Sequence, residues 1–241
     1  MSAVVEPVDV LAGAEVVESF RALGVTAFTT GRAAGSFSLQ SDEPARDVSA
    51  RWTALRAQLG GATVRLATAA QVHGREVLIH ESGWRGWLRG DAADGHVSAV
   101  RGTAMAVTVA DCVPVFILHP AGAAAVVHSG WRGTEARITA AAISELAALG
   151  FPADELLVHC GPAICGRCYE VSPDVATRLT GMLATEPTRV DLRAIIAEHA
   201  RQCGVHQISI SPLCTRCDND RFFSHRAGDP GRQLGVLALS P

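Results

Sequence analysis

The stretch AMAVTVADCVPVFILHPAGAAAVVHSGWRG, residues 104–133, holds the densest apolar runs of the 241-residue chain. These runs are nearly uniformly apolar, as central strands buried on both faces should be, and they cover Ala104–Val109, Val113–Leu118 and Ala123–Val127. Polar residues interrupt or end them at Asp111, Cys112 and His128. The pattern predicts a buried sheet with chemically active side chains where its strands end or break.

Further elements are expected on both sides of this stretch. Strands are predicted over Val25–Thr30, Val64–Ala67, Glu76–Ile79, Leu156–His159, Ile208–Ile210 and Leu234–Leu239. Helices are predicted over Asp47–Leu59, Glu135–Leu149, Pro173–Leu183 and Asp191–Cys203, with Gly60-Gly61 ending the first and Thr134 capping the second. The turn-rich segment Ser82–Gly95 is expected to be a loop.

Helices and strands therefore mix without regular alternation. This favours an α+β fold in which helices cover a mixed sheet or sandwich. A chain of 241 residues with 48% hydrophobic content can bury one large core, and it shows no linker or low-complexity tract. We expect a single domain over residues 1–241.

Charge and cysteine content narrow the functional class. The net charge of -3 and a pI of about 6.3 provide no basic field to attract nucleic acid or anionic lipid. Met1–Ala14 lacks the basic start of a secretion signal, and the apolar stretch Ala104–Leu118 is too short to span a bilayer. We expect a cytoplasmic protein without nucleic-acid or membrane partners, whose seven cysteines are free thiols or metal ligands.

Two imidazoles and one thiolate stand out as candidate metal ligands: His73, Cys112 and His128. Three ligands of mixed nitrogen and sulfur type leave the fourth position of a tetrahedral zinc ion open, as in catalytic sites. Their spacing matches no local zinc finger, so the fold must bring them together. Singly, a histidine at a strand end is more often a satisfied polar residue, and a cysteine in an apolar run is more often a small buried hydrophobe.

The neighbours of these ligands suggest further roles. The Gly130–Gly133 turn leads into a predicted helix, and its amides, with Arg132, are candidates for binding phosphate. The alternative for Arg132 is pairing with a carboxylate or packing against a neighbour. Asp111 is the candidate for proton transfer, and the alternative is that it orients the metal ligands.

Two C-x2-C pairs, Cys165/Cys168 and Cys214/Cys217, resemble a second zinc site. The segment between them is far longer than the usual intervening length of about 15 to 20 residues. Isolated buried thiols are therefore the preferred interpretation, and a structural tetrathiolate site is the alternative.

Taken together, the motifs resemble the laccase-domain family, whose members are described as polyphenol oxidases, purine nucleoside phosphorylases and the peptidoglycan editing factor. The matching motifs follow one another in order: Gln71–Gly74, Ala110–Pro114, His128–Gly133, Gly161–Ile164 with Tyr169–Val171, Cys214-Thr215, and Phe222–Ser224 with Gly231-Arg232. The resemblance implies that His73, Cys112 and His128 bind zinc. It also implies a layered α/β/β/α sandwich similar to the cytotoxic necrotizing factor catalytic domain.

The resemblance further implies the activity. We expect a zinc-dependent purine nucleoside phosphorylase with adenosine deaminase activity, acting on adenosine, inosine, guanosine and, as a further candidate, methylthioadenosine. Its partners would be a nucleoside and phosphate, and the substrate-binding candidates are Ser38, Gln71, Gly130 and Arg132. The substrate-side loops depart from the family pattern at Ser38–Asp42, Arg51-Trp52 and Ser224–Ala227.

Two alternatives remain open at this point. The first is a copper-dependent polyphenol oxidase, for which three mixed ligands provide too few copper centres. The second is an amidase or peptidoglycan editing factor in which His128 activates Cys112 as a nucleophile. The oligomeric state is open.

Overall fold

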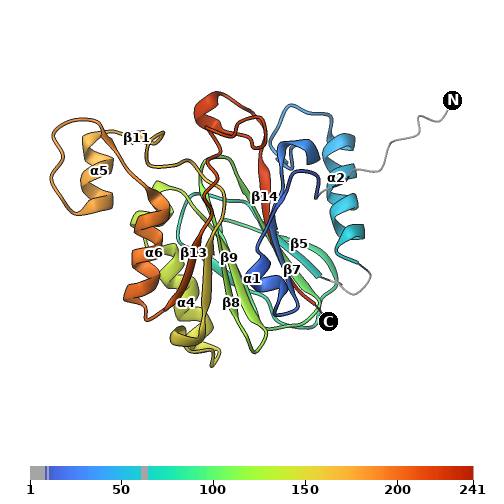
Figure 1. Cartoon of the computed structure of the whole chain (residues 1–241). Helices are drawn as coiled ribbons and strands as arrows, with labels where there is room; N and C mark the ends of the chain where they lie inside the picture. The colour runs from blue at the N-terminus through green and yellow to red at the C-terminus, as the bar shows by residue number, and fades with distance from the viewer. Residues whose placement is uncertain (1–8, 10, 61–64, 241) are drawn as a thin grey trace.

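Two six-stranded mixed sheets form the centre of the computed structural model, which describes residues 9, 11–60 and 65–240 (Figure 1). The first sheet has the order β1 (Glu15–Val16), β2 (Val25–Thr29), β14 (Gln233–Leu239), β7 (Thr103–Val109), β3 (Arg65–Ala69) and β5 (Gly86–Gly90). The second has the order β13 (Gln207–Ile210), β10 (Leu157–Cys160), β8 (Val113–His119), β9 (Ala123–Ser129), β6 (Gly95–Ser98) and β4 (Val77–Ile79). A short pair, β11 (Glu170–Val171) and β12 (Thr188–Arg189), lies apart from both.

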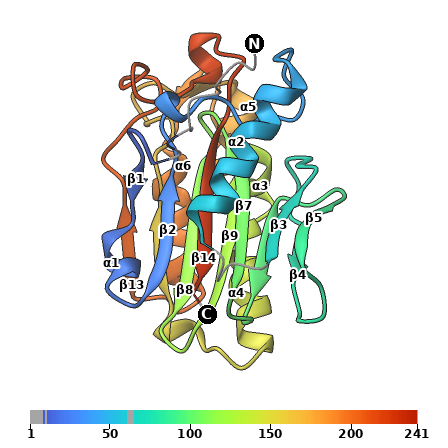
Figure 2. The ribbon, with the colours of Figure 1, turned by 90° about the vertical axis from the view of Figure 1, so that its right-hand side faces the viewer.

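Helices cover the two outer faces of this pair of sheets. Helix α2 (Ala45–Gln58) lies on the first sheet, while α4 (Ile138–Ala148) and α6 (Leu192–Gln202) lie on the second (Figure 2). The shorter helices are α1 (Glu18–Arg21), α3 (Trp131–Glu135) and α5 (Pro173–Thr180). The expected α/β/β/α layering is confirmed, and the likeness to the cytotoxic necrotizing factor domain stays a prediction.

Alternation along the apolar strands explains the layers. On β8, Phe116 packs between the sheets, whereas Ile117 faces the cluster under α4 and α6. On β14, Leu237 packs between the sheets, whereas Val236 faces the cluster under α2. Successive side chains of a strand point to opposite faces, so a strand covered on both sides has to be apolar throughout. Each such fully buried side chain contributes roughly 1.5–3 kcal/mol to folding.

The expectation that Ser82–Gly95 is a loop is wrong. The segment contains β5 and the first residue of β6, and β5 is an edge strand paired with β3 alone. Its three central residues, Trp87, Leu88 and Arg89, are exposed and do not alternate apolar and polar, and the glycines at both ends of the strand resemble turn residues.

The helix expected over Glu135–Leu149 is also different in the structure. Gly130 in extended conformation starts α3, so Thr134 lies inside this helix rather than at a cap, with its hydroxyl 2.9 Å from that of Ser129. Arg137, at φ +60°, separates α3 from α4. The single predicted helix is therefore two.

The remaining strand and helix predictions agree with the structure to within a few residues, with one shorter helix. Helix α5 ends at Thr180, because Gly181 adopts φ +71° there, and not at Leu183. Gly61, Val64 and most of Met1–Ala14 lie outside the described residues. Among the helices that the structure describes, none combines the length and apolar character needed to cross a bilayer.

Candidate metal centre and its two cavities

The three predicted ligands meet at one end of the sheets. His73 lies in the loop after β3, Cys112 in the turn between β7 and β8, and His128 near the end of β9. Their ligand atoms all lie within 4.8 Å of one another, and the two imidazole rings cross at 84°. We call these residues the three-ligand cluster.

The backbone around this cluster is held in uncommon conformations. His73 and Asp111 both have positive φ, +60° and +76°, which non-glycine residues rarely adopt. A Cβ atom at Gly130 would come within 2.8 Å of the Cys112 sulfur, so any side chain here would displace that ligand. Such strain is typical of functional sites, where the surrounding contacts maintain it.

Asp94, which the sequence analysis missed, supplies those contacts. Its carboxylate is fully buried and accepts hydrogen bonds from the backbone N–H groups of Val72, His73 and Gly74, at 3.1, 3.0 and 2.7 Å. The Nδ1 atom of His128 lies 2.8 Å from Asp94 Oδ1. One side chain thus fixes the loop that carries the first histidine and also orients the second. Its only sequence signal was an acidic residue in a segment read as a loop.

Without a metal, Cys112 and His128 form a thiolate–imidazolium pair, and a metal ion would have to displace the proton of His128. Burial alone would raise the pKa of Cys112, but the charge and hydrogen bonds of His128, with smaller contributions from His73, lower it to about 6. Burial disfavours the charged form of His128, yet the Cys112 thiolate and Asp94 raise its pKa to about 9. With Nδ1 directed to the carboxylate, Nε2 is left for coordination. A thiolate and two imidazoles could hold a metal and leave one tetrahedral position open.

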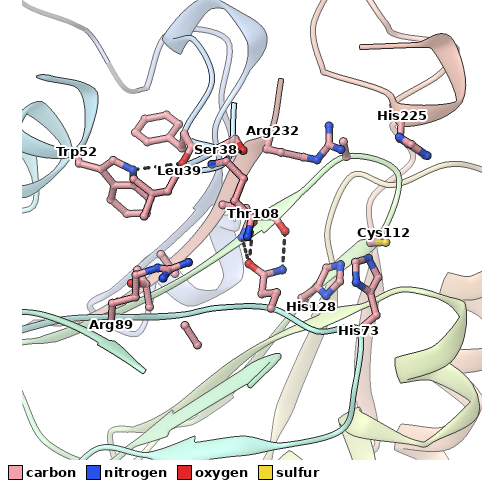
Figure 3. A pocket seen from close by; sticks show the side chains of 17 residues that line it. Ser38, Leu39, Trp52, His73, Arg89, Thr108, Cys112, His128, His225 and Arg232 are labelled. Atoms are coloured by element: carbon pink, nitrogen blue, oxygen red, sulfur yellow. Dashed lines mark hydrogen bonds between the residues drawn. The ribbon is translucent and has the colours of Figure 1, made fainter. Parts of the chain in front are cut away.

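A cavity of about 350 Å³ opens on one side of the three-ligand cluster (Figure 3). At its far end stand Trp52, which donates a hydrogen bond to the carbonyl of Phe37, and the half-exposed Leu39. The cations Arg89 and Arg232 also line it. Arg89 went unrecognised because it lies on β5, the strand that was expected to be a loop.

Two of the predicted substrate-binding residues lie in this first cavity. Ser38 lines it, and its hydroxyl accepts a hydrogen bond from the Gln40 amide at 3.2 Å. Gln71 also lines it, but its amide oxygen accepts bonds from both the N–H and the hydroxyl of Thr108, and its nitrogen donates to the Thr108 carbonyl. The contacts of Gln71 thus join the His73 loop to β7.

A second cavity, of about 270 Å³, lies on the other side of the cluster. It contains the other two predicted substrate-binding residues, Gly130 and Arg132, together with Arg226. The guanidinium of Arg132 stacks 4.3 Å from the Trp131 ring centre, and that of Arg226 lies 4.8 Å from the Tyr169 ring centre.

The two cavities meet at the three-ligand cluster. Both are lined by His73, Cys112 and His225, and Figure 3 shows His225 above Cys112. His225 lies in Ser224–Ala227, a segment that departs from the family pattern, and no sequence feature singled it out. A ligand in either cavity would therefore reach the same few atoms.

Asp111 lies in the second cavity, but its carboxylate is already engaged. Oδ1 accepts the Thr215 hydroxyl at 2.6 Å, and Oδ2 accepts the backbone N–H of Arg226 at 2.7 Å. Its backbone carbonyl accepts the Ile164 amide at 3.1 Å. These contacts favour a positioning role, in which Asp111 ties the Cys112 turn to two other segments, over proton transfer.

A further carboxylate organises the loop that carries His225. Asp229 Oδ2 accepts hydrogen bonds from Arg32 and Asn219, each at 2.6 Å, and from the Ser224 amide at 2.8 Å. Burial opposes its charged form, but the Arg32 guanidinium and the other donors lower the pKa of Asp229 to about 2.

The preferred interpretation of the C-x2-C pairs as isolated buried thiols is wrong. The sulfur atoms of Cys165, Cys168, Cys214 and Cys217 all lie within 4.8 Å of one another, and Cys217 is exposed. The segments containing them run side by side, joined by a parallel bridge between Ala163 and Cys214. Sequence spacing failed as a guide because tertiary pairing, rather than a local turn, brings the two pairs together.

The chain matches one family model over nearly its whole length. The family described as multi-copper polyphenol oxidoreductase laccase matches residues 17–240. The purine nucleoside phosphorylase SCO2081 of Streptomyces coelicolor is 35% identical over 192 residues, which cover 75% of this chain and 78% of that protein. The adenosine deaminase RL5 from an unknown prokaryotic organism is 31% identical over 215 residues, covering 81% and 79%.

Solved structures share the fold. The hypothetical protein YfiH of Bacillus licheniformis superposes with a TM-score of 0.85 at 23% identity, covering 93% of this chain and 96% of that one. YlmD of Geobacillus stearothermophilus gives a TM-score of 0.84 at 25% identity, covering 90% and 93%.

Proposed function

Because this chain belongs to the family described as multi-copper polyphenol oxidoreductase laccase, whose relatives include proteins named for nucleoside chemistry, we propose that it is a zinc-dependent purine nucleoside phosphorylase that also deaminates adenosine. One observation carries the proposal. Two cavities of different character meet at the three-ligand cluster, which suits a reaction between two substrates.

Zinc is the metal that we assign to His73, Cys112 and His128. Borderline-soft zinc accepts thiolate and imidazole together, and the Asp94–His128 contact is the outer-shell arrangement that typically orients a zinc-binding histidine. When bound, zinc would supply a Lewis acid that lowers the pKa of a water molecule.

The first cavity is the site proposed for the nucleoside. Its volume of about 350 Å³ lies within the usual range for small-molecule pockets. Apolar groups at Phe37 and Leu39 suit the faces of a purine, while Ser38, Thr108 and Arg89 offer polar contacts for its edge or for the ribose. Adenosine, inosine and guanosine share this combination of a flat base and a polar sugar, as does methylthioadenosine apart from its thioether.

The second cavity is the site proposed for phosphate. Arg132 and Arg226 bring two guanidinium groups to it, and planar guanidinium groups bind phosphate oxygens in pairs. Helix α3 has only five residues, so the arginines rather than a helix dipole must supply the positive charge. Phosphate in the second cavity would lie next to His73, Cys112 and His225, which line both cavities.

Phosphorolysis follows from this placement. A phosphate oxygen forms a bond to C1′ of the ribose, the bond from C1′ to N9 breaks, and its electron pair leaves with the purine. The departing base then needs a proton, and His225, which lines both cavities, is the residue we assign to deliver it. In deamination, water adds at C6 of adenine and ammonia leaves, and the same imidazole is placed to protonate the leaving amine.

The experiment incubates the zinc-loaded protein with adenosine or inosine, with and without phosphate, and quantifies free base, ribose 1-phosphate and inosine. We expect phosphate-dependent release of base and ribose 1-phosphate, and formation of inosine from adenosine without phosphate. Cys112→Ser should abolish both reactions, whereas Cys203→Ser, a matched change of a thiol outside both metal clusters, should leave them intact. If neither product forms, the proposal fails.

A second candidate function has one specific observation in its favour. Asp94, His128 and Cys112 form a relay like that of cysteine hydrolases, with a thiol pKa of about 6. Under this alternative the protein would be an amidase or act in peptidoglycan editing. Iodoacetamide labelling separates the two: a metal-bound Cys112 should react only after chelation, whereas a free nucleophile should react equally with and without chelator.

Copper-dependent phenol oxidation finds less support in the residues. The described part of the chain gathers two metal-binding clusters, one with two imidazoles and one with none. A multi-copper centre needs more imidazole ligands than these clusters offer. Metal analysis of protein purified without added metal tests this, because stoichiometric copper without zinc would favour the oxidase.

A further inference from the structure

Four cysteines from two pairs that are distant in sequence come together in space. We call them the thiol cluster: Cys165, Cys168, Cys214 and Cys217. Each C-x2-C pair contributes two sulfur atoms, and all four lie within 4.8 Å of one another. Cys168 Sγ lies 3.4 Å from Cys217 Sγ. A tetrahedral zinc ion with bonds of about 2.3 Å holds its sulfur ligands about 3.8 Å apart, which agrees with this spacing.

Hydrogen bonds to sulfur also fit thiolate ligands. Cys214 is buried, and its Sγ accepts the backbone N–H of Cys165 at 3.3 Å and that of Cys217 at 3.4 Å. Backbone N–H groups directed at a sulfur atom are the outer-shell contacts that a metal-bound thiolate accepts. Within the described residues these four are the cysteines that cluster, while Cys203 and Cys160 belong to neither metal-binding group.

Two arginines near the thiol cluster could balance the negative charge of such a site. Four thiolates around a divalent ion carry a net charge of about −2. Each C-x2-C pair contains an arginine just before its second cysteine, Arg167 and Arg216. Arg216 donates to the carbonyl of Cys168 at 3.2 Å, so it crosses from one pair to the other.

We propose that Cys165, Cys168, Cys214 and Cys217 bind one zinc ion in a closed tetrahedral site. All four coordination positions would be filled by protein, so this ion would be structural, in contrast to the open three-ligand cluster. Binding releases the protons of those thiols that are not already ionised, and no oxidant or reductant is involved.

The position of this ion in the fold indicates its role. One C-x2-C pair lies in the segment between β10 and β11, and the other precedes the loop that carries His225 and Arg226. Tyr169 follows Cys168 directly, and Thr215, next to Cys214, donates to Asp111. The ion would fasten together the two segments that form a wall of the second cavity and tie down the Cys112 turn.

Counting zinc in matched variants tests the proposal. Protein purified without added metal should contain about two zinc ions per chain, and Cys112→Ser about one, because only its thiol cluster remains complete. The double variant Cys168→Ser/Cys217→Ser should lose about one ion and melt at a lower temperature, while the Cys203→Ser control keeps both properties of the parent.

The result also separates this proposal from the proposed function. If the three-ligand cluster binds no metal, the parent and Cys112→Ser would carry the same single zinc, and the inference would stand. It would be overturned if Cys112→Ser contains no metal, or if the double variant keeps all the zinc of the parent. Peptide mapping that finds a disulfide between Cys168 and Cys217 in freshly purified protein would overturn it as well.

The double variant could unfold, so the folded Cys112→Ser protein provides an independent measurement. Cobalt(II) added after zinc removal should give the intense visible bands of a tetrahedral all-thiolate site, saturating at about one ion per chain. Weak bands typical of an octahedral, oxygen-rich site would contradict the proposal.

Discussion

Replacing Asp94 by asparagine removes one charge and almost no volume from the centre of the site. The carboxylate accepts four hydrogen bonds, two at each oxygen, from three backbone amides and from His128. Wherever the asparagine NH2 group is placed, it points a donor at two other donors. The side chain is fully buried, so no water can take over the lost bonds without a rearrangement.

The cost can be estimated from these contacts. Each hydrogen bond to a buried charged group contributes about 1.5–3 kcal/mol, so losing two costs about 3–6 kcal/mol of unfolding free energy. This is a large share of the total stability of a typical domain, about 5–15 kcal/mol. His128 would also lose the negative charge that orients its ring, which typically lowers metal affinity about 10- to 100-fold.

Two measurements check the two parts of this prediction. Urea unfolding in the presence of chelator reports the change in the apoprotein, and competition with a zinc indicator reports the change in affinity. Asp91→Asn is the matched control, because Asp91 precedes Asp94 in the same segment but is exposed. If Asp94→Asn is as stable as the control and binds zinc as tightly, Asp94 is not the organising residue of the site.

Three further predictions concern other parts of the site. Gly130→Ala should lower the unfolding free energy by about 1–3 kcal/mol and weaken zinc binding, because its Cβ would meet the Cys112 sulfur at 2.8 Å. At Gly74 the nearest atom lies at 3.5 Å, so Gly74→Ala should change neither quantity in the same unfolding and zinc assays. Asp229→Asn should lower the melting temperature at pH 7 by about 4–8 °C, from a loss of about 2 kcal/mol. The pKa of Asp229 is lowered to about 2 in the folded protein, so the difference from the parent should persist above about pH 4 and vanish as the pH falls to 2; a constant difference in melting scans would contradict this. Arg226→Gln keeps the backbone N–H to Asp111 and should raise the KM for phosphate about tenfold with an unchanged KM for inosine, and equal changes in both constants would argue against a phosphate site.

The sequence was informative where a single physical cause dominates. Strands buried on both faces must be apolar throughout, so β7, β8 and β9 could be recognised from composition alone. The three ligands could be identified from the glycine and aspartate residues beside them and from the family resemblance, because His119 and His159 also lie at strand ends. The edge strand β5 could not, since it is mostly exposed and its glycines imitate a turn.

Features that depend on tertiary contacts escaped prediction. Asp94 looks like any loop carboxylate until the fold brings three amides and an imidazole around it. The thiol cluster was discounted on sequence spacing, although a parallel bridge between distant segments makes that spacing irrelevant. Thr134 was predicted to cap the helix because threonine is a favourable N-cap residue. Instead Gly130, in extended conformation, is the N-cap, so the helix starts four residues earlier.

The dependence of catalysis on zinc at the three-ligand cluster tests the central claim most directly. The chelated protein is reloaded with increasing zinc, and the rate of hypoxanthine release from inosine and phosphate is measured. The zinc bound by Cys112→Ser under the same conditions is subtracted from the zinc bound by the parent, which leaves the zinc at the three-ligand cluster. We predict a rate that rises in proportion to this zinc, with one ribose 1-phosphate formed for each hypoxanthine. A rate that persists after complete chelation, or that copper restores and zinc does not, would contradict the account.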